Sequence, residues 1–139
     1  MKKELNSIML IDDNPDDNFI HERAIRKINM ESTIVQKQSG MEALTYLKSA
    51  ESPHTDLIFL DINMPEMNGW EFLAQYGKLE KNLQCQAIII MLTTSDDGDD
   101  TANARKWSTV TDFITKPLTE KKMSTICEKY FTPPCPHSG

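Results

Sequence analysis

Short apolar runs alternate with amphipathic stretches along this chain. The runs have the length of strands, and several are apolar at nearly every position: they cover 8–11, 33–35, 57–60, 87–92 and 113–114. Continuous rather than alternating apolar character is typical of strands buried on both faces, as in a parallel sheet with helices above and below.

Between these runs, apolar residues recur at helical spacing. The predicted stripes are Ile20, Ala24 and Ile28; Ala43, Leu44 and Leu47; Phe72, Leu73 and Tyr76; and Met123, Ile126, Cys127 and Tyr130. A fifth helix is expected within 97–107, where the apolar pattern is weakest. Residues 14–17, Asn-Pro-Asp-Asp, have the composition of a helix start.

Five strand and helix pairs in strict alternation imply right-handed crossovers and an α/β fold. We predict a flavodoxin-like, doubly wound sheet of five parallel strands in the order 2-1-3-4-5, with five helices. In such a sheet the loops after strands 1, 3, 4 and 5 meet at one edge. The residues of those loops are therefore the candidate site.

Chemically active side chains occupy these loops. Asp12 and Asp13 follow the first strand, Asp61 the third, Thr93 the fourth and Lys116 the fifth. Carboxylates held together repel one another, and a hard cation such as Mg²⁺ relieves that repulsion through oxygen ligands. An aspartate can be the nucleophile in phosphoryl transfer, and Asp61 at the centre of the sheet is the best placed. Lys116 and Thr93 can each bind a phosphoryl oxygen.

Length and charge narrow the possible functions. The 139 residues suit one domain, expected over 1–131, followed by a flexible proline-rich tail over 132–139. A net charge of −6 disfavours direct binding to nucleic acid or to an anionic membrane. The first apolar run is too short for export or membrane insertion. Three cysteines without C-x-x-C spacing favour reduced thiols and a cytoplasmic location.

Taken together, these segments resemble the receiver domains of two-component response regulators, in particular stand-alone, chemotaxis-regulator-like ones. The resemblance rests on Asp12-Asp13, on 60–69 (LDINMPEMNG), on 92–94 (LTT) and on 113–117 (FITKP), and it covers about 6–131. It implies that Asp61 is the phosphoacceptor and that Mg²⁺ is the cofactor. It further implies that Asp13, Asp61 and the Asn63 carbonyl are metal ligands, that Asp12 binds through water, and that Thr93 and Lys116 hold the phosphoryl group.

The resemblance also implies partners and a readout. A histidine kinase or histidine phosphotransfer protein would donate the phosphoryl group, the chain would catalyse only its own phosphorylation and dephosphorylation, and an unidentified protein would receive the signal. Thr93 and Phe113 are the implied switch residues. The implied output surface, formed by helix 4, strand 5 and helix 5, is also a possible homodimer interface. Without a hydroxyl, Phe113 either switches sterically or only packs.

Two segments depart from the family pattern. Many receiver domains carry Gly-Ala shortly before the fifth strand, whereas residues 106–112 read KWSTVTD here. The turn into that strand is therefore expected to be built differently. Residues 95–100 are also unusually acidic, so the fourth helix is expected to start late or to move freely.

Two other functions remain open. A phosphatase of the haloacid dehalogenase type also uses an aspartate nucleophile, but its nucleophile ends the first core strand and its acidic pair comes last, the reverse of the order seen here. A pseudo-receiver or flavodoxin-like module would bind partners without turning over phosphate. The acidic loop after the first strand would repel a flavin phosphate, so phosphorylation is the test that separates these readings.

Overall fold

The computed structural model describes residues 4–28, 31–49, 55–62, 64–79, 87–93, 107 and 110–131. Its strands are β1 (Ser7–Ile11), β2 (Thr33–Lys37), β3 (Leu57–Asp61), β4 (Ile88–Thr93) and β5 (Val110–Thr115). Its helices are α1 (Pro15–Ile28), α2 (Gly40–Lys48), α3 (Gly69–Tyr76) and α6 (Glu120–Tyr130). The predicted helix within 97–107, the acidic segment 95–100 and the tail 132–139 fall outside the described residues, apart from Trp107.

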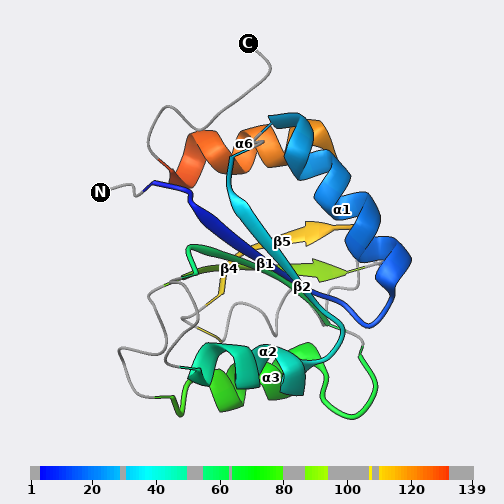
Figure 1. The fold of residues 1–139 in the computed structure, drawn as a ribbon, viewed down its shortest axis with the longest axis vertical. Helices are drawn as coiled ribbons and strands as arrows, with labels where there is room; N and C mark the ends of the chain where they lie inside the picture. The colour runs from blue at the N-terminus through cyan, green and yellow to red at the C-terminus, as the bar shows by residue number, and fades with distance from the viewer. Residues whose placement is uncertain are drawn as a thin grey trace.

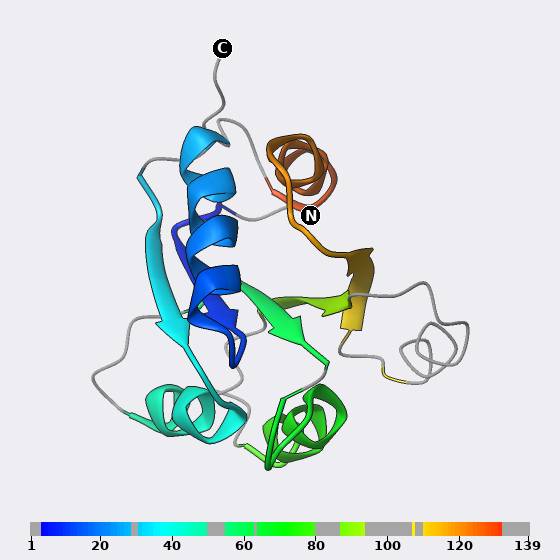
Figure 2. The same cartoon turned by 90° about the vertical axis from the view of Figure 1, so that its right-hand side faces the viewer.

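All five strands pair in parallel in the order β2-β1-β3-β4-β5, which confirms the predicted flavodoxin-like fold. Helices α1 and α6 lie on one face of the sheet, and α2 and α3 lie on the other (Figure 1 and Figure 2). Each face has its own hydrophobic cluster, because successive side chains of a strand point to opposite faces. Strands β1, β3 and β4 are thus buried on both sides, as their continuous apolar runs predict.

Three of the four described helices bury the stripes predicted for them: Ala43, Leu44 and Leu47 in α2; Phe72, Leu73 and Tyr76 in α3; and Met123, Ile126 and Cys127 in α6. Only Tyr130, at the end of α6, is half-buried instead.

Helix α1 buries only part of the predicted stripe. Ile28 is buried as predicted and Ala24 is half-buried, but Ile20 is 50% exposed, and Asn18, His21 and Ile25 are buried in addition. Asn18 takes a buried position because its Nδ2 donates to the main-chain oxygens of Asp12 at 3.1 Å and Lys37 at 3.3 Å. These two bonds fix the first turn of α1 to the ends of β1 and β2, and so orient the helix beside the candidate site.

The start of α3 is held against the end of β3. An added Cβ at Gly69 would lie 2.8 Å from the Asp61 carbonyl oxygen and 3.0 Å from the Ile62 Cα, so this contact requires glycine. The Gly69 amide donates to the Ile62 carbonyl at 2.8 Å. Asn68 and Glu71 form a capping box at the same helix end. These contacts fix the backbone that carries Asp61.

Strand β5 is longer than its short apolar run suggests and pairs irregularly with β4. Its register shifts between Ile89 and Ile90, which pair with Val110 and Asp112, respectively, so Thr111 is an extra residue. The bulge lets Val110 and Phe113 pack against the same cluster, on the α2 and α3 face. Of the residues leading into β5 the structure describes only Trp107, so the expected difference in that turn stays a prediction.

The prediction of reduced thiols is wrong for Cys127, which is disulfide-bonded. An odd number of cysteines excludes pairing of all three but not of two, and chain spacing does not reveal which side chains meet in space. Cysteine content therefore no longer supports a cytoplasmic location. Within the described residues, none of the helices has the length and apolar character needed to cross a membrane.

Candidate functional site

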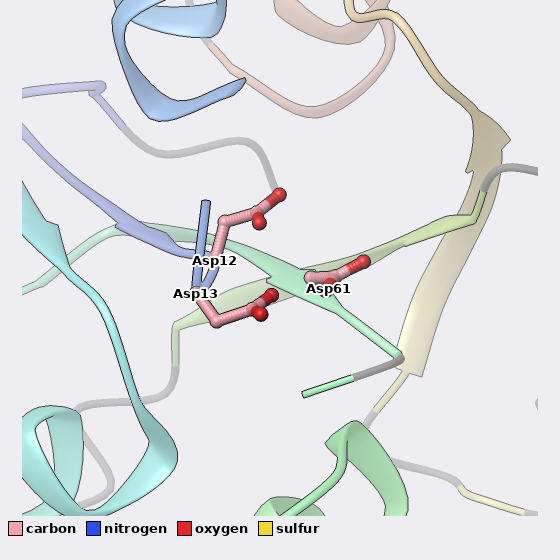
Figure 3. Close-up of side chains that lie close together, drawn as sticks. All are labelled: Asp12, Asp13 and Asp61. Atoms are coloured by element: carbon pink, nitrogen blue, oxygen red, sulfur yellow. The ribbon is translucent and has the colours of Figure 1, made fainter. Parts of the chain in front are cut away.

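Three aspartates converge at the carboxyl ends of the central strands. Asp12 and Asp13 lie in the turn directly after β1, and Asp61 is the last residue of β3. Their carboxyl groups extend to the same side (Figure 3), and one oxygen from each lies within 4.8 Å of the others. Asp12 and Asp61 are buried and Asp13 is exposed. The predicted convergence of the two loops is confirmed.

Lys116 closes the site from the end of β5. Its Nζ lies 2.6 Å from Asp12 Oδ2, 2.9 Å from Asp17 Oδ2 and 3.2 Å from Asp61 Oδ1, and its side chain is only 10% exposed. The Lys116 amide donates to the Thr93 carbonyl at 2.6 Å, and the bond to Pro117 is cis. The ammonium therefore sits inside the acidic cluster.

Three further residues were predicted to belong to the site or to its switch: Thr93, Phe113 and Asn63. Thr93 is fully buried as the last residue of β4, where it pairs with Thr115, the residue before Lys116. Phe113 is half-buried and packs against the cluster on the α2 and α3 face. Asn63, whose carbonyl the family pattern makes a metal ligand, lies outside the described residues.

The site raises the pKa of Asp61 from its usual 3.8 to about 6. Burial is the largest cause, the Asp12 carboxylate adds to it, and the Lys116 ammonium opposes both. Withdrawal from water disfavours the charged form of a carboxyl group, and a second nearby anion does the same. One ammonium therefore only partly compensates the acidic cluster.

For Lys116 the balance favours the charged form. Burial alone would lower its pKa, but the hydrogen bonds to Asp12 and Asp17, together with the charges of Asp61 and Asp12, outweigh burial and raise that pKa above its ordinary value. Lys116 is thus a permanent cation of the site. It can stabilise negative charge but cannot serve as a general base near neutral pH.

The raised pKa of Asp61 predicts a pH-dependent stability in metal-free protein. The folded state binds a proton at Asp61 more tightly than the unfolded state does, so this stabilisation is complete below about pH 4 and is lost as the pH rises through about 6. We expect the unfolding free energy of wild type relative to Asp61→Asn to fall by up to about 3 kcal/mol over that range. Chemical denaturation in EDTA at a series of pH values measures this difference, and a pH-independent difference would contradict it.

The three aspartates suit a hard divalent cation. Oxygens on opposite sides of a bound Mg²⁺ lie about 4 Å apart, close to the spacing of these carboxylates. Oxygen donors of this kind favour Mg²⁺, Ca²⁺ or Mn²⁺ over metals that prefer nitrogen or sulfur ligands. A dication would also offset the repulsion that raises the pKa of Asp61. The residues present therefore fit such an ion.

Sequence reasoning missed three polar residues of α1 that border the site. Asp17 was interpreted only as part of a helix start, yet it bonds Lys116. Asn18 joins the helix to the strand ends, and His21 is buried with an unpaired Nδ1. The charge of Lys116 adds to burial in lowering the pKa of His21. The only signal in the sequence was their spacing: Asp17, Asn18 and His21 stand at positions i, i+1 and i+4 of the helix that follows the acidic turn.

Comparison with known proteins points to one family. A family model described as the response regulator receiver domain matches residues 8–128. Among curated proteins, the chain is 27% identical over 128 residues to hybrid signal transduction histidine kinase L of Dictyostelium discoideum, covering 92% of this chain. It spans only 7% of that protein's length, and 14% and 65% of two further relatives that it matches.

Solved structures show the same relationship. A two-component response regulator from Cytophaga hutchinsonii superposes with a TM-score of 0.79 at 29% identity, covering 91% of this chain and 97% of the other. The phosphorylated cyanobacterial phytochrome response regulator RcpA gives a TM-score of 0.72 at 28% identity, covering 88% of each chain. The structural similarity therefore extends over most of this chain and most of each of the two solved structures.

Proposed function

The chain belongs to the response regulator receiver domain family, and on that premise we propose that it is a signalling switch that accepts a phosphoryl group on Asp61. The observation that carries the proposal is the setting of this carboxylate. It ends the central strand β3, and an oxygen of it lies 3.2 Å from the Lys116 Nζ, beside the Asp12 and Asp13 carboxylates. Receiver domains are signalling modules, so the product is a modified state of the protein itself.

In the proposed reaction an Asp61 oxygen attacks the phosphorus of a phosphohistidine. A bond between that oxygen and phosphorus forms, the bond between phosphorus and the histidine nitrogen breaks, and its electron pair stays on the histidine. No proton has to be removed from an ionised Asp61. The task of the protein is to position the groups and to stabilise charge. In this account Lys116 and the Thr93 hydroxyl bind the oxygens of the transferred group.

Asp12, Asp13 and Asp61 would hold the divalent cation, which we take to be Mg²⁺, with the Asn63 carbonyl as a further ligand and Asp12 binding through water. The ion supplies charge neutralisation for the incoming phosphoryl group. Asp61, with a pKa of about 6, is only partly protonated near neutral pH and becomes fully ionised beside a cation. The nucleophile is then in its reactive form.

The proposed donor is a histidine kinase or histidine phosphotransfer protein, and the proposed receiver of the signal is a protein partner. Phosphorylation adds about −1.5 to −2 charges to the site. In this proposal the Thr93 hydroxyl moves toward the phosphoryl group. Phe113, half-buried on β5, transmits the change to the predicted output surface, which is formed by the expected fourth helix, by β5 and by α6. A homodimer through that surface and a cytoplasmic location both remain predictions.

A haloacid dehalogenase-type phosphatase is a poorer account of this site. Its nucleophile would end the first core strand and its acidic pair would come last, whereas here the acidic pair follows β1 and the single Asp61 ends β3 at the centre of the sheet. The family match over 8–128 adds to this argument. The order of these residues therefore disfavours a phosphatase of this type.

Incubation with acetyl phosphate tests the proposal. In Mg²⁺ the intact mass of the wild type is expected to increase by one phosphoryl group, and EDTA is expected to abolish the increase, because the carboxylates then remain uncompensated. Magnesium added in excess of EDTA is the matched control and should restore the modification. A mass that stays unchanged with acetyl phosphate and with histidine kinases alike would favour a pseudo-receiver that only binds partners.

A further inference from the structure

Lys116 has one more acidic partner than the phosphorylation chemistry requires. An ammonium group has three N–H donors, and here its neighbours are Asp12, Asp17 and Asp61. Asp12 and Asp61 belong to the carboxylate cluster that fits a cation. Asp17 does not: it lies in the first turn of α1, and its side chain is 32% exposed. Its bond to Lys116 spans 99 residues of sequence.

Competition between the lysine and a cation makes this extra partner significant. Asp12 Oδ2 lies 2.6 Å from the Lys116 Nζ, a charge-assisted hydrogen bond slightly shorter than is usual for such pairs. Its other oxygen, Oδ1, accepts from the Asn14 amide at 3.0 Å. Both oxygens of Asp12 therefore already accept one hydrogen bond each. The charge of Lys116 beside Oδ2 repels a cation that is attracted to the same carboxylate, so the two compete for it.

Asp17 offers Lys116 an acceptor outside the carboxylate cluster. The bond to Asp17 Oδ2, at 2.9 Å, draws the ammonium toward α1 and uses one of its three donors. The position of Asp17 is in turn fixed, because Asn18, the next residue, is tied to the main-chain oxygens of Asp12 and Lys37. A cation at the cluster leaves Asp17 as the partner of Lys116 that is not itself a ligand.

We propose that Asp17 is a positioning residue that shares the Lys116 ammonium and so releases Asp12 and Asp61 to bind the divalent cation. This inference rests on the proposed function only in taking the three-aspartate cluster as the cation site. Without the Asp17 charge, Asp12 and Asp61 are the remaining carboxylate partners of the Lys116 ammonium, and it interacts more strongly with both. The cation must then displace a more tightly held ammonium, and its affinity falls.

A simpler role for Asp17 is stabilisation of the helix. Acidic side chains in a first turn interact favourably with the helix dipole, and Asp16 and Asp17 both lie in the first turn of α1. Asp16 is exposed, and its amide donates to Asn14 Oδ1 at 2.9 Å. Asp16→Asn therefore removes the same charge from the same turn and leaves Asp12, Asp17 and Asp61 in place around Lys116, which makes it the matched control.

The test is a double-mutant cycle read by calorimetric titration with Mg²⁺ and with Mn²⁺, in the absence of any phosphoryl donor. We expect Asp17→Asn to weaken binding of both ions about tenfold, the scale found for residues that orient metal ligands. Asp16→Asn should change affinity less than about twofold, as expected for an exposed charge. In a Lys116→Met background, Asp17→Asn should have no larger effect than Asp16→Asn. Circular dichroism checks folding, and Lys116→Gln replaces Lys116→Met if the latter does not fold.

Two results would overturn the inference. One is equal binding by Asp17→Asn and Asp16→Asn in the presence of Lys116. The other is a tenfold loss that persists unchanged when Lys116 has been replaced, since Asp17 would then act on the ion directly. Because no donor is present, the outcome is independent of phosphorylation. A wild type that binds Mg²⁺ with this coupling but accepts no phosphoryl group would defeat the proposed function alone.

Discussion

Asp61→Asn is expected to gain no phosphoryl group from acetyl phosphate and Mg²⁺ under conditions that modify the wild type. An amide oxygen is a poor nucleophile, and the amide carries no negative charge to attract the cation. No other carboxylate takes over in this account: Asp12 is held by Lys116 and the Asn14 amide, and Asp13 is exposed at the rim. Intact-mass measurement over time quantifies the loss, which should be complete.

Asp13→Asn is the matched control for this result. It removes a carboxylate from the same cluster and leaves the proposed acceptor in place. We expect it to weaken Mg²⁺ binding and to slow modification, with the phosphoryl group still accumulating at high Mg²⁺ concentration. If Asp13→Asn abolished modification while Asp61→Asn slowed it, the roles of acceptor and ligand would have to be exchanged.

Lys116→Met is expected to separate cation binding from phosphoryl transfer. Loss of the ammonium removes the competitor for Asp12 and Asp61, so Mg²⁺ should bind more tightly. The same loss removes the cation that stabilises the transferred phosphoryl group, and modification should slow by about 100-fold or more. Without metal, two buried carboxylates lose their partner, so the fold should be less stable by about 3 to 5 kcal/mol.

Lys116→Met is thus expected to increase Mg²⁺ affinity while it decreases the rate of phosphorylation, and this combination distinguishes the prediction from simple loss of structure. A variant that is merely misfolded would lose both metal affinity and reactivity. Lys121→Met, which removes an exposed lysine from α6, is the charge-matched control and should leave both near wild-type values. Titration calorimetry and a mass time course supply the two measurements. Weaker Mg²⁺ binding by folded Lys116→Met would contradict the competition between lysine and cation.

The strands and most helices were predictable because burial leaves a direct trace in the sequence. Strands β1, β3 and β4 are covered on both faces, and their residues are apolar almost throughout. The strand β5 is half-buried and begins with an irregular register, so only Phe113 and Ile114 stood out among its six residues. Parallel topology then placed the strand ends, and with them the residues of the site, at one edge.

Helix α1 shows what pattern reading cannot supply. The apolar stripe through Ile20 was plausible by spacing, but two hydrogen bonds to strand ends favour burial of Asn18 instead. A rotation of this kind depends on the positions of carbonyl groups that only the folded sheet fixes. The ion pair between Asp17 and Lys116 was not predictable either. It joins residues far apart in the sequence, and Asp17 already had a local explanation as a helix-start residue.

Chemical mapping of the phosphorylated residue tests the central claim most directly. Borohydride reduces an aspartyl phosphate to homoserine, which permanently marks the acceptor. After treatment with acetyl phosphate and Mg²⁺, peptide mass spectrometry is expected to find homoserine at position 61 and to find none when EDTA is present. Homoserine at Asp12 or Asp13, or an unmarked Asp61 in protein that carries the phosphoryl group, would contradict the account.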